Sequence, residues 1–357
     1  YYRLVRDLIM AVLGAAAGGG KSVLQTLSFI NSTTWSPAQD MNAKIYVIGA
    51  GGSGGAGTYV GTGGGAGGCA VTIADLAAST TYTITIGAPG LPVHFGPSNG
   101  NAGGNTTFAG SGISTLTGSG GQAGLYGSSA ATKAGGAGGA ASGGTYGNFT
   151  GGAGGATSGS GASYMATGGG AVGLWATGTS APAINGSTAG ADGNFYFSDS
   201  GYNRAVGAGA SVGGTFLSKY HSTQGSNVYV EIVRQQQGGL ISLGGMGGQT
   251  DNAAQVWWNY QGTYDSEQKA GILPMGMGGR PSYANGNASV ISPQAGAFAG
   301  SGGVFSATNA SYWALSGPGG LGGGSGASIN GGGSANTFTM TGQGGVGCVL
   351  IEVLEYK

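Results

Sequence analysis

Alternation of apolar and polar residues marks several short strands along the chain. In the stretch TYTITIG (81–87), the tyrosine and the two isoleucines fall on one side of an extended chain and the threonines on the other. This period of two is the pattern of a half-buried strand. The stretches 44–49, 69–76 and 227–234 resemble it. The pattern therefore predicts strands in these places and an all-β fold.

The C-terminal stretch VGCVLIEVLEYK differs because it is apolar on both sides. Val349, Ile351 and Val353 alternate with Leu350 and Leu354. A strand that is apolar on both faces is typical of the inside of a sheet that is covered on both sides. We therefore expect the chain to close its domain in the middle of a covered sheet.

Two long glycine tracts, about 110–190 and 238–346, separate these strands and repeat roughly every three residues. A period of three belongs to the polyproline II conformation, in which only glycine fits where chains touch. Gly/Ser composition is also typical of flexible linkers, but linkers rarely carry so many alanines and aromatic residues. The sequence thus predicts an all-β fold whose β-sandwich base anchors a bundle of polyglycine II helices.

Composition narrows the possible partners. The chain has 357 residues, of which 86 are glycine, 40% are hydrophobic and 6% are charged, and its formal net charge is zero. A neutral chain with few Lys and Arg residues lacks the positive surface that nucleic acids require. The apolar run 8–17 is shorter than the roughly 20 residues that span a bilayer. We therefore expect neither nucleic-acid binding nor membrane insertion.

A nucleotide-binding pattern occurs in KIYVIGAGGSGGAG (44–57), where Gly49, Gly51 and Gly54 have the spacing of a dinucleotide-binding loop. That loop works only at the N-terminus of a helix, and each glycine that follows costs about 1 kcal/mol of helix propensity. A relaxed phosphate-loop pattern, AAAGGGKS (15–22), precedes a β-branched and aromatic stretch. We expect no nucleotide at either place.

Residues that could carry catalysis are few. The two histidines, His94 and His221, lie in predicted loops, and the two cysteines, Cys69 and Cys348, lie on apolar strands outside any CxxC pair. The cysteines are expected to be buried free thiols or a single bridge. The sequence therefore predicts no enzyme, no catalytic residue, no metal and no cofactor.

Aromatic residues gather in polar islands that interrupt the glycine rhythm, chiefly at 192–204 and 251–269. Tyr and Trp supply large contact areas at low entropic cost, and Gly or Ser neighbours adapt around them. Some of these rings are expected to fill the core instead. The candidate receptor-binding residues are Trp257, Trp258, Tyr260, Tyr264, Tyr196, Tyr202, Trp175 and Trp313.

Four stretches together resemble the glycine-rich domain of bacteriophage tail fibres: SFINSTTWSPAQDMNAKIYVIGAGGSGG, GGCAVTIADLAASTTYTITIGAPG, GNTTFAG and GGVGCVLIEVLEYK. The resemblance covers about residues 28–110 and 340–357, and the interior is similar in composition to the distal adhesins of T-even-like phages. The residues that carry it are Phe29, Trp35, Pro37, Tyr82, Phe108 and Glu352.

This resemblance implies a tail fibre tip on the virion that binds a bacterial surface protein or polysaccharide and contacts other tail fibre or tail tip proteins. Residues 1–27 have no counterpart in it, and we interpret them as an attachment or trimerisation segment of a homotrimer. The expected division is then a sandwich part at 28–110, a glycine-rich region at 111–345 with an inserted strand near 227–234, and a closing strand at 346–357. An extracellular structural or ice-binding protein is the alternative, and a secreted enzyme or nucleotide-binding protein is a weaker one.

Overall fold

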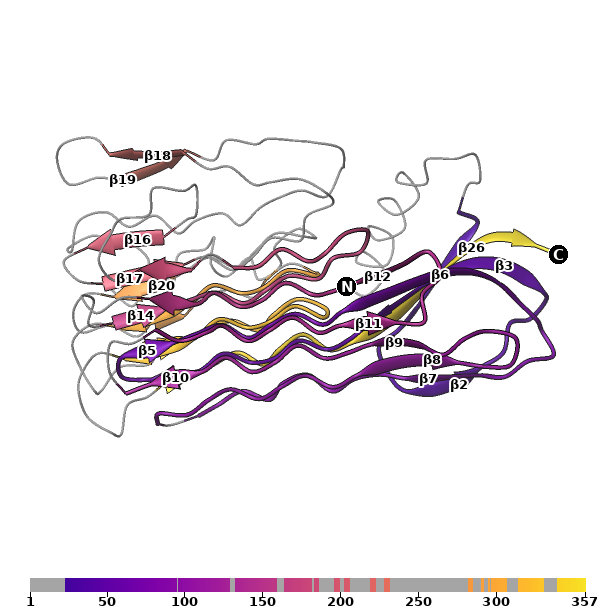
Figure 1. Ribbon diagram of the computed structural model, residues 1–357, viewed down its shortest axis with the longest axis horizontal. Helices are drawn as coiled ribbons and strands as arrows, with labels where there is room; N and C mark the ends of the chain where they lie inside the picture. The colour runs from indigo at the N-terminus through magenta and orange to yellow at the C-terminus, as the bar shows by residue number, and fades with distance from the viewer. Residues whose placement is uncertain are drawn as a thin grey trace.

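The computed structural model describes residues 23–181 except 95, 129–131 and 159–163; 183–185; the strands between 196 and 231; 282–284; 290–291; 295–330 except 296 and 307–313; and 339–357. Within these residues there is no helix, and strands form several sheets. The predicted all-β fold is confirmed. The molecule is elongated, with a β-sandwich and the C-terminus at one end (Figure 1).

Two five-stranded sheets form the sandwich. The first has the order β1-β26-β3-β6-β12 and the second the order β11-β9-β8-β7-β2. The first sheet contains β1 (Gln25–Phe29), β26 (Cys348–Tyr356), β3 (Met41–Ile48), β6 (Cys69–Leu76) and β12 (Gly147–Phe149). The second contains β11 (Ala141–Ser142), β9 (Leu116–Gly118), β8 (Thr106–Ala109), β7 (Tyr82–Thr85) and β2 (Thr33–Trp35). Both sheets draw strands from either side of residue 110, so the sandwich and the glycine-rich region are interleaved along the sequence.

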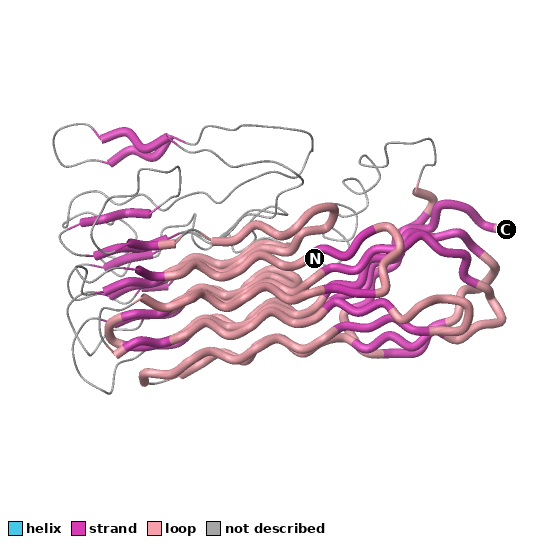
Figure 2. Tube along the Cα trace, in the orientation of Figure 1, coloured by secondary structure: helices cyan, strands magenta, loops and turns pink. Residues whose placement is uncertain are grey.

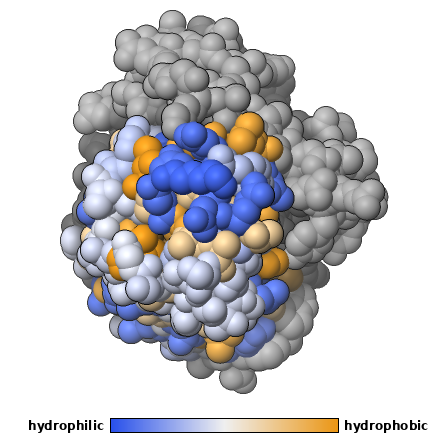
Figure 3. Space-filling view, turned by 90° about the vertical axis from the view of Figure 1, so that its right-hand side faces the viewer, coloured by the Kyte–Doolittle hydropathy of each residue, from blue (hydrophilic) through white to orange (hydrophobic). Residues whose placement is uncertain are grey.

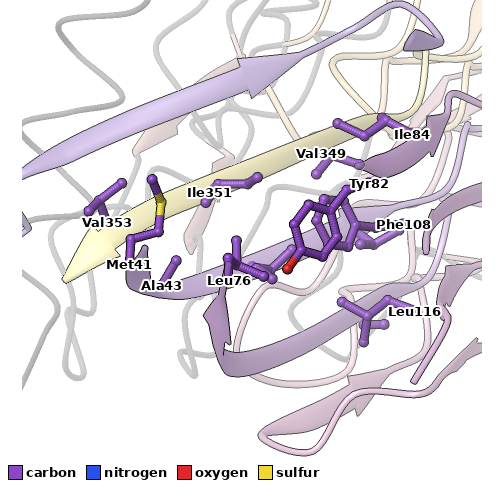
Figure 4. Packing of buried hydrophobic residues seen from close by; sticks show 13 residues of the cluster. Met41, Ala43, Leu76, Tyr82, Ile84, Phe108, Leu116, Val349, Ile351 and Val353 are labelled. Atoms are coloured by element: carbon purple, nitrogen blue, oxygen red, sulfur yellow. The ribbon is translucent and has the colours of Figure 1, made fainter. Parts of the chain in front are cut away.

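The main hydrophobic core lies between these sheets (Figure 4). The rings of Tyr82 and Phe108 stack there, with centroids 5.2 Å apart. In β7, Tyr82 and Ile84 are buried whereas Thr83 and Thr85 are exposed. The alternation predicted from the sequence is confirmed, because a half-buried strand places every second residue against the core.

Strand β26 is covered on both faces, as its sequence predicts. It pairs with β1 on one side and with β3 on the other. Val349, Ile351 and Val353 face the core between the two sheets. On the opposite face, Leu350 packs in a second cluster that includes Phe298. The closing strand therefore joins both hydrophobic clusters of the molecule.

Long segments that are neither helix nor strand run side by side from the sandwich to the other end of the molecule (Figure 2). In residues 49–56, successive N–H groups donate to neighbours that recur every third residue. Gly49, Gly52 and Gly55 donate to the segment 62–68; Ala50, Ser53 and Ala56 donate to the segment 98–104; and Gly51 and Gly54 donate to Gly345 and Ser325. Each segment is thus hydrogen-bonded in several directions, whereas a strand is bonded in two.

Glycine is required because backbones meet directly at these positions. A Cβ added at Gly51, Gly52, Gly54 or Gly55 would lie within 3.0 Å of a carbonyl oxygen of a neighbouring segment. Real Cβ atoms do not approach that closely. The third position of the repeat holds small buried residues such as Ser53. The glycines are therefore packing residues, and the segments form one lattice.

Buried hydroxyl groups link segments inside this lattice. Ser325 Oγ accepts the N–H of Gly54 at 3.0 Å and donates to the carbonyl of Gly342 at 2.6 Å. Thr167 Oγ1 does the same between Gly63 and Gly155. Such hydroxyls satisfy backbone groups that would otherwise be buried without a partner.

Short strands end the segments away from the sandwich (Figure 1). One sheet has the order β10-β5-β14-β17-β16, with bounds Tyr126–Gly127, Val60–Gly61, Tyr164–Ala166, Tyr202–Ala205 and Tyr196–Asp199. A second has the order β20-β22-β24-β4, with bounds Ser282–Ala284, Val304–Ser306, Ser328–Asn330 and Ala56–Gly57. A third has the order β21-β23-β25, with bounds Val290–Ile291, Ala314–Leu315 and Thr339–Met340. Two further sheets have two strands each: β13 (Thr157–Ser158) pairs with β15 (Ile184–Asn185), and β18 (Lys219–Ser222) pairs with β19 (Val228–Glu231). Strand β19 lies within the stretch 227–234, where the sequence predicts a strand.

Candidate functional site

The candidate site is the end of the molecule opposite the sandwich, which we call the outer end. There outgoing segments end and returning segments begin; examples are the turn at 57–60 and the described residues 91–94, 96–98, 127–128 and 132–133. Turns at the other end join the strands of the sandwich. The fold therefore gathers turns that are far apart in sequence onto one surface (Figure 1).

Hydrogen bonds fix the described turns of the outer end to the lattice. The N–H of Val93 donates to Thr341 Oγ1 at 2.9 Å, and the N–H of Thr341 donates back to the Val93 carbonyl at 3.1 Å. Asn101 Nδ2 donates to the Leu91 carbonyl at 2.9 Å. These turns are held in place, which is the usual setting of binding residues on a rigid scaffold.

Three described side chains give the outer end an aromatic and apolar character. Leu91 is 64% exposed and Tyr59 is 37% exposed. The Tyr126 ring lies against the backbone of Gly57, and the Tyr126 N–H donates to Asn99 Oδ1 at 2.9 Å. These residues were not among the candidates chosen from the sequence, although each stands in a short interval between glycine runs.

Charged side chains gather instead at the sandwich end, where Figure 3 shows a hydrophilic patch. Lys357 Nζ lies 2.7 Å from Asp75 Oδ2, and Asn42 Nδ2 donates to Asp75 Oδ1 at 2.8 Å. In the described turns of the outer end, His94 and Lys133 are the only His, Lys, Arg, Asp or Glu residues, whereas the described strands β16 to β19 contain Asp199, Arg204, Lys219, His221 and Glu231.

The structure locates only some of the predicted receptor-binding residues. Tyr196 and Tyr202 lie in β16 and β17, which pair in the sheet that also contains β5 and β10. The structure thus places these two residues in strands that Figure 1 shows at the outer end. Trp257, Trp258, Tyr260, Tyr264 and Trp313 lie outside the described residues.

Trp175 lies at the sandwich side of the lattice. It packs against the second hydrophobic cluster, with its ring 6.4 Å from that of Tyr46 and at 89° to it. The structure therefore places Trp175, a candidate receptor-binding residue, half-buried against this cluster and away from the outer end. A ring that lies next to an apolar sheet face is stabilised by burial, and the sequence pattern does not reveal this neighbour.

The dinucleotide-like motif lies at the junction of β3 and the lattice. Gly49, Gly51 and Gly54 follow the strand directly, and their N–H groups donate to neighbouring segments. The chain then continues as an extended segment and a short strand. These glycines therefore pack against backbone in the places where a phosphate site would need a helix N-terminus.

Both cysteines are buried free thiols. Cys69 on β6 and Cys348 on β26 are both register partners of Ile48, which lies on the strand between them. Two strand spacings separate them by about 9.6 Å, and a disulfide requires Cα atoms closer than about 7 Å. Of the two alternatives left by the sequence, the structure selects free thiols.

Among the described residues, no three or more His, Cys, Asp or Glu side chains are grouped so that they could hold a metal ion. The same residues contain no helix with the length and apolar character needed to cross a membrane.

Comparison with known families matches residues 25–228 to the model of a glycine-rich domain. The match covers more than half of the chain, from β1 of the sandwich into β19. Comparison with curated proteins finds no match.

Proposed function

The chain belongs to the family of glycine-rich domains, and from this premise we propose that it is the receptor-binding tip of a bacteriophage tail fibre. The observation that carries the proposal is the separation of the two ends. The sandwich holds β1 and the C-terminal strand at one end, and the turns gather at the other. A protein that is attached at its base and binds with its tip requires this arrangement.

In this proposal the glycine segments form a bundle of polyglycine II helices. The support is the three-residue period of the hydrogen-bond partners in 49–56 and the backbone contact at the glycines between them. A helix with three residues per turn directs successive N–H groups to different neighbours. Such a bundle gives the turns a stiff support without a large hydrophobic core.

The partner in this proposal is a protein or polysaccharide of the bacterial surface. The turns would bind it through aromatic side chains and amides, with Tyr59 and Tyr126 added to the residues chosen from the sequence. Rigid aromatic side chains beside adaptable polar ones are typical of recognition surfaces. The sandwich would contact other tail fibre or tail tip proteins in a homotrimer on the virion. No catalytic residue or cofactor takes part.

Binding to bacteria tests the proposal. Fluorescently labelled protein is incubated with a panel of bacterial strains, beside a folded Trp257→Ala/Trp258→Ala variant and an Asp75→Asn control at the sandwich end. We expect binding to some strains only, loss of binding in the tryptophan variant and retention in the control. Absence of binding to every strain would contradict the adhesin.

A second candidate is an ice-binding or structural role, which one surface of the lattice favours. Ala134, Ala137 and Ala140 are exposed at every third residue of one segment, so small side chains repeat regularly along it. In a three-residue helix their spacing is about 9.3 Å. Measured thermal hysteresis at high protein concentration would support this role, and its absence would remove the ice-binding form of it.

A further inference from the structure

The sheet β1-β26-β3-β6-β12 has one face that points away from the second sheet of the sandwich. This face contains a buried carboxyl group that the proposed function does not use. Glu352, in β26, is 3% exposed. Its Oε2 accepts a hydrogen bond from the Tyr46 hydroxyl at 3.2 Å, and its Oε1 has no partner among the described residues. A carboxylate offers about four acceptor positions, so one hydrogen bond leaves it under-satisfied.

A second unpaired oxygen lies on the neighbouring strand. Thr26 of β1 is the register partner of Glu352. Its Oγ1 is also buried without a partner in the described chain. Side chains directly opposite in an antiparallel pair have Cβ atoms about 4.5–5.5 Å apart. The two unpaired oxygens therefore belong to side chains that face each other across the β1–β26 pair.

On the other side of Glu352, its register partner on β3 is the charged residue Lys44. Its ammonium lies over two aromatic rings, 5.1 Å from the centroid of Tyr46 and 4.4 Å from that of Tyr146. No ion pair forms between Lys44 and Glu352 in the structure, although their charges attract. The other titratable groups on this face are two buried thiols, Cys69 of β6 and Cys348 of β26, and the carboxylate of Asp75, which contacts Lys357 and Asn42.

Together these contacts favour the neutral acid form of Glu352 over its ionised carboxylate form. Burial raises the pKa of Glu352 to about 6, and the charge of Lys44 and the Tyr46 hydrogen bond only partly oppose this rise. Burial lowers the pKa of Lys44 itself. A buried charge without a close partner is costly. The Thr26 hydroxyl can donate to the carboxylate and accept from the neutral acid, so burial is what favours the neutral form.

We propose that Glu352 is a proton-operated latch that fastens the edge strand β1 to β26 under mildly acidic conditions and loosens it at neutral pH. The proton bound to the carboxyl group removes the buried charge that would otherwise face Thr26 across the strand pair. Its loss leaves a buried charge at the pair that joins the first described strand to the last. This inference does not depend on the adhesin proposal.

Linkage gives the sign and the size of the effect. Because the folded chain holds the proton more tightly than the unfolded chain, stability is highest at low pH and falls as the pH rises through about 6. With an ordinary pKa of 4.5, the equilibrium for closing this strand pair changes roughly eightfold between pH 5 and pH 7.5.

Hydrogen exchange of the β1 amides, corrected for the intrinsic rate at each pH, tests the latch in the full chain. We expect roughly eightfold higher protection at pH 5 than at pH 7.5. Glu352→Gln, which is neutral and can donate to Thr26, should hold the high protection at both pH values. Glu355→Gln, an exposed neighbour on the same strand, should keep the pH dependence of the unmodified chain.

Two results would overturn the proposal. One is equal protection of β1 at pH 5 and pH 7.5 in the unmodified chain. The other is a change of similar size that persists in Glu352→Gln, since another group would then be responsible. Thermal unfolding of Glu352→Gln at both pH values shows whether the variant is folded.

Discussion

A matched pair of substitutions in the segment 134–140 tests whether backbone packing holds the lattice together. Its sequence is AGGAGGA, and its three alanines are exposed. A Cβ added at any of its four glycines would lie within 3.0 Å of a carbonyl oxygen of another segment. Gly136 and Ala137 are adjacent and make a matched pair, since Gly136→Ala and Ala137→Ser each add one heavy atom.

The expected cost of Gly136→Ala follows from its surroundings. The new methyl group would meet the carbonyl of Gln122. A neighbouring segment must then move, and overpacking of this kind costs about 1–3 kcal/mol. Movement also weakens the hydrogen bond from the Gly136 N–H to the Gly63 carbonyl, 2.9 Å long, which contributes about 1 kcal/mol. Alanine recovers about 0.4–1 kcal/mol through the unfolded chain, so the net destabilisation is about 1–3.6 kcal/mol.

The assay is the free energy of unfolding from denaturant titration of the full chain and of both variants. We expect about 1–3.6 kcal/mol lost in Gly136→Ala and a change within about 0.5 kcal/mol in Ala137→Ser, because its side chain is exposed. If Gly136→Ala were as stable as the unmodified chain, the glycines would not be packing residues. Equal damage from Ala137→Ser would refute the three-residue period.

Two further outcomes are expected from the buried polar groups. Ser325→Ala removes the hydroxyl that joins two backbone groups of other segments, and we expect it to lower the free energy of unfolding by about 2–4 kcal/mol. The exposed control Ser79→Ala should leave that free energy unchanged. Equal stability of the two variants would contradict the role of the Ser325 hydroxyl in joining the segments. Burial raises the pKa of the Cys348 thiol to about 12 and also raises the pKa of Cys69. A thiol reagent at pH 8 should therefore modify neither cysteine until denaturant is added. Rapid labelling of the folded chain would show that the two thiols are not buried.

Local patterns in the sequence predicted four strands of the sandwich, β3, β6, β7 and β26. Strand β6 has the predicted bounds, and β26 is covered on both faces. These elements were predictable because alternation and apolar runs record the burial of each residue along one short stretch. The glycine repeat likewise indicated backbone packing.

The partners of each segment could not be predicted in the same way. Gly54 bonds to Ser325, which lies 271 positions away, and glycine-rich segments of nearly equal composition offer no signal that distinguishes one neighbour from another. The same limit applies to the aromatic residues. Trp175 packs against the core, whereas Tyr59 is partly exposed, because the neighbours that decide their burial come from distant segments.

Site-specific blocking tests most directly whether the outer end binds the receptor. Single cysteines are introduced at Ser128, in an exposed turn of the outer end, or at Ser79, exposed at the sandwich end, and each is coupled to a bulky polymer. The native cysteines are buried and should not react. We predict that the polymer at Ser128→Cys abolishes binding to bacteria and that the polymer at Ser79→Cys leaves it intact. The reverse result would contradict the assignment of the outer end as the binding surface.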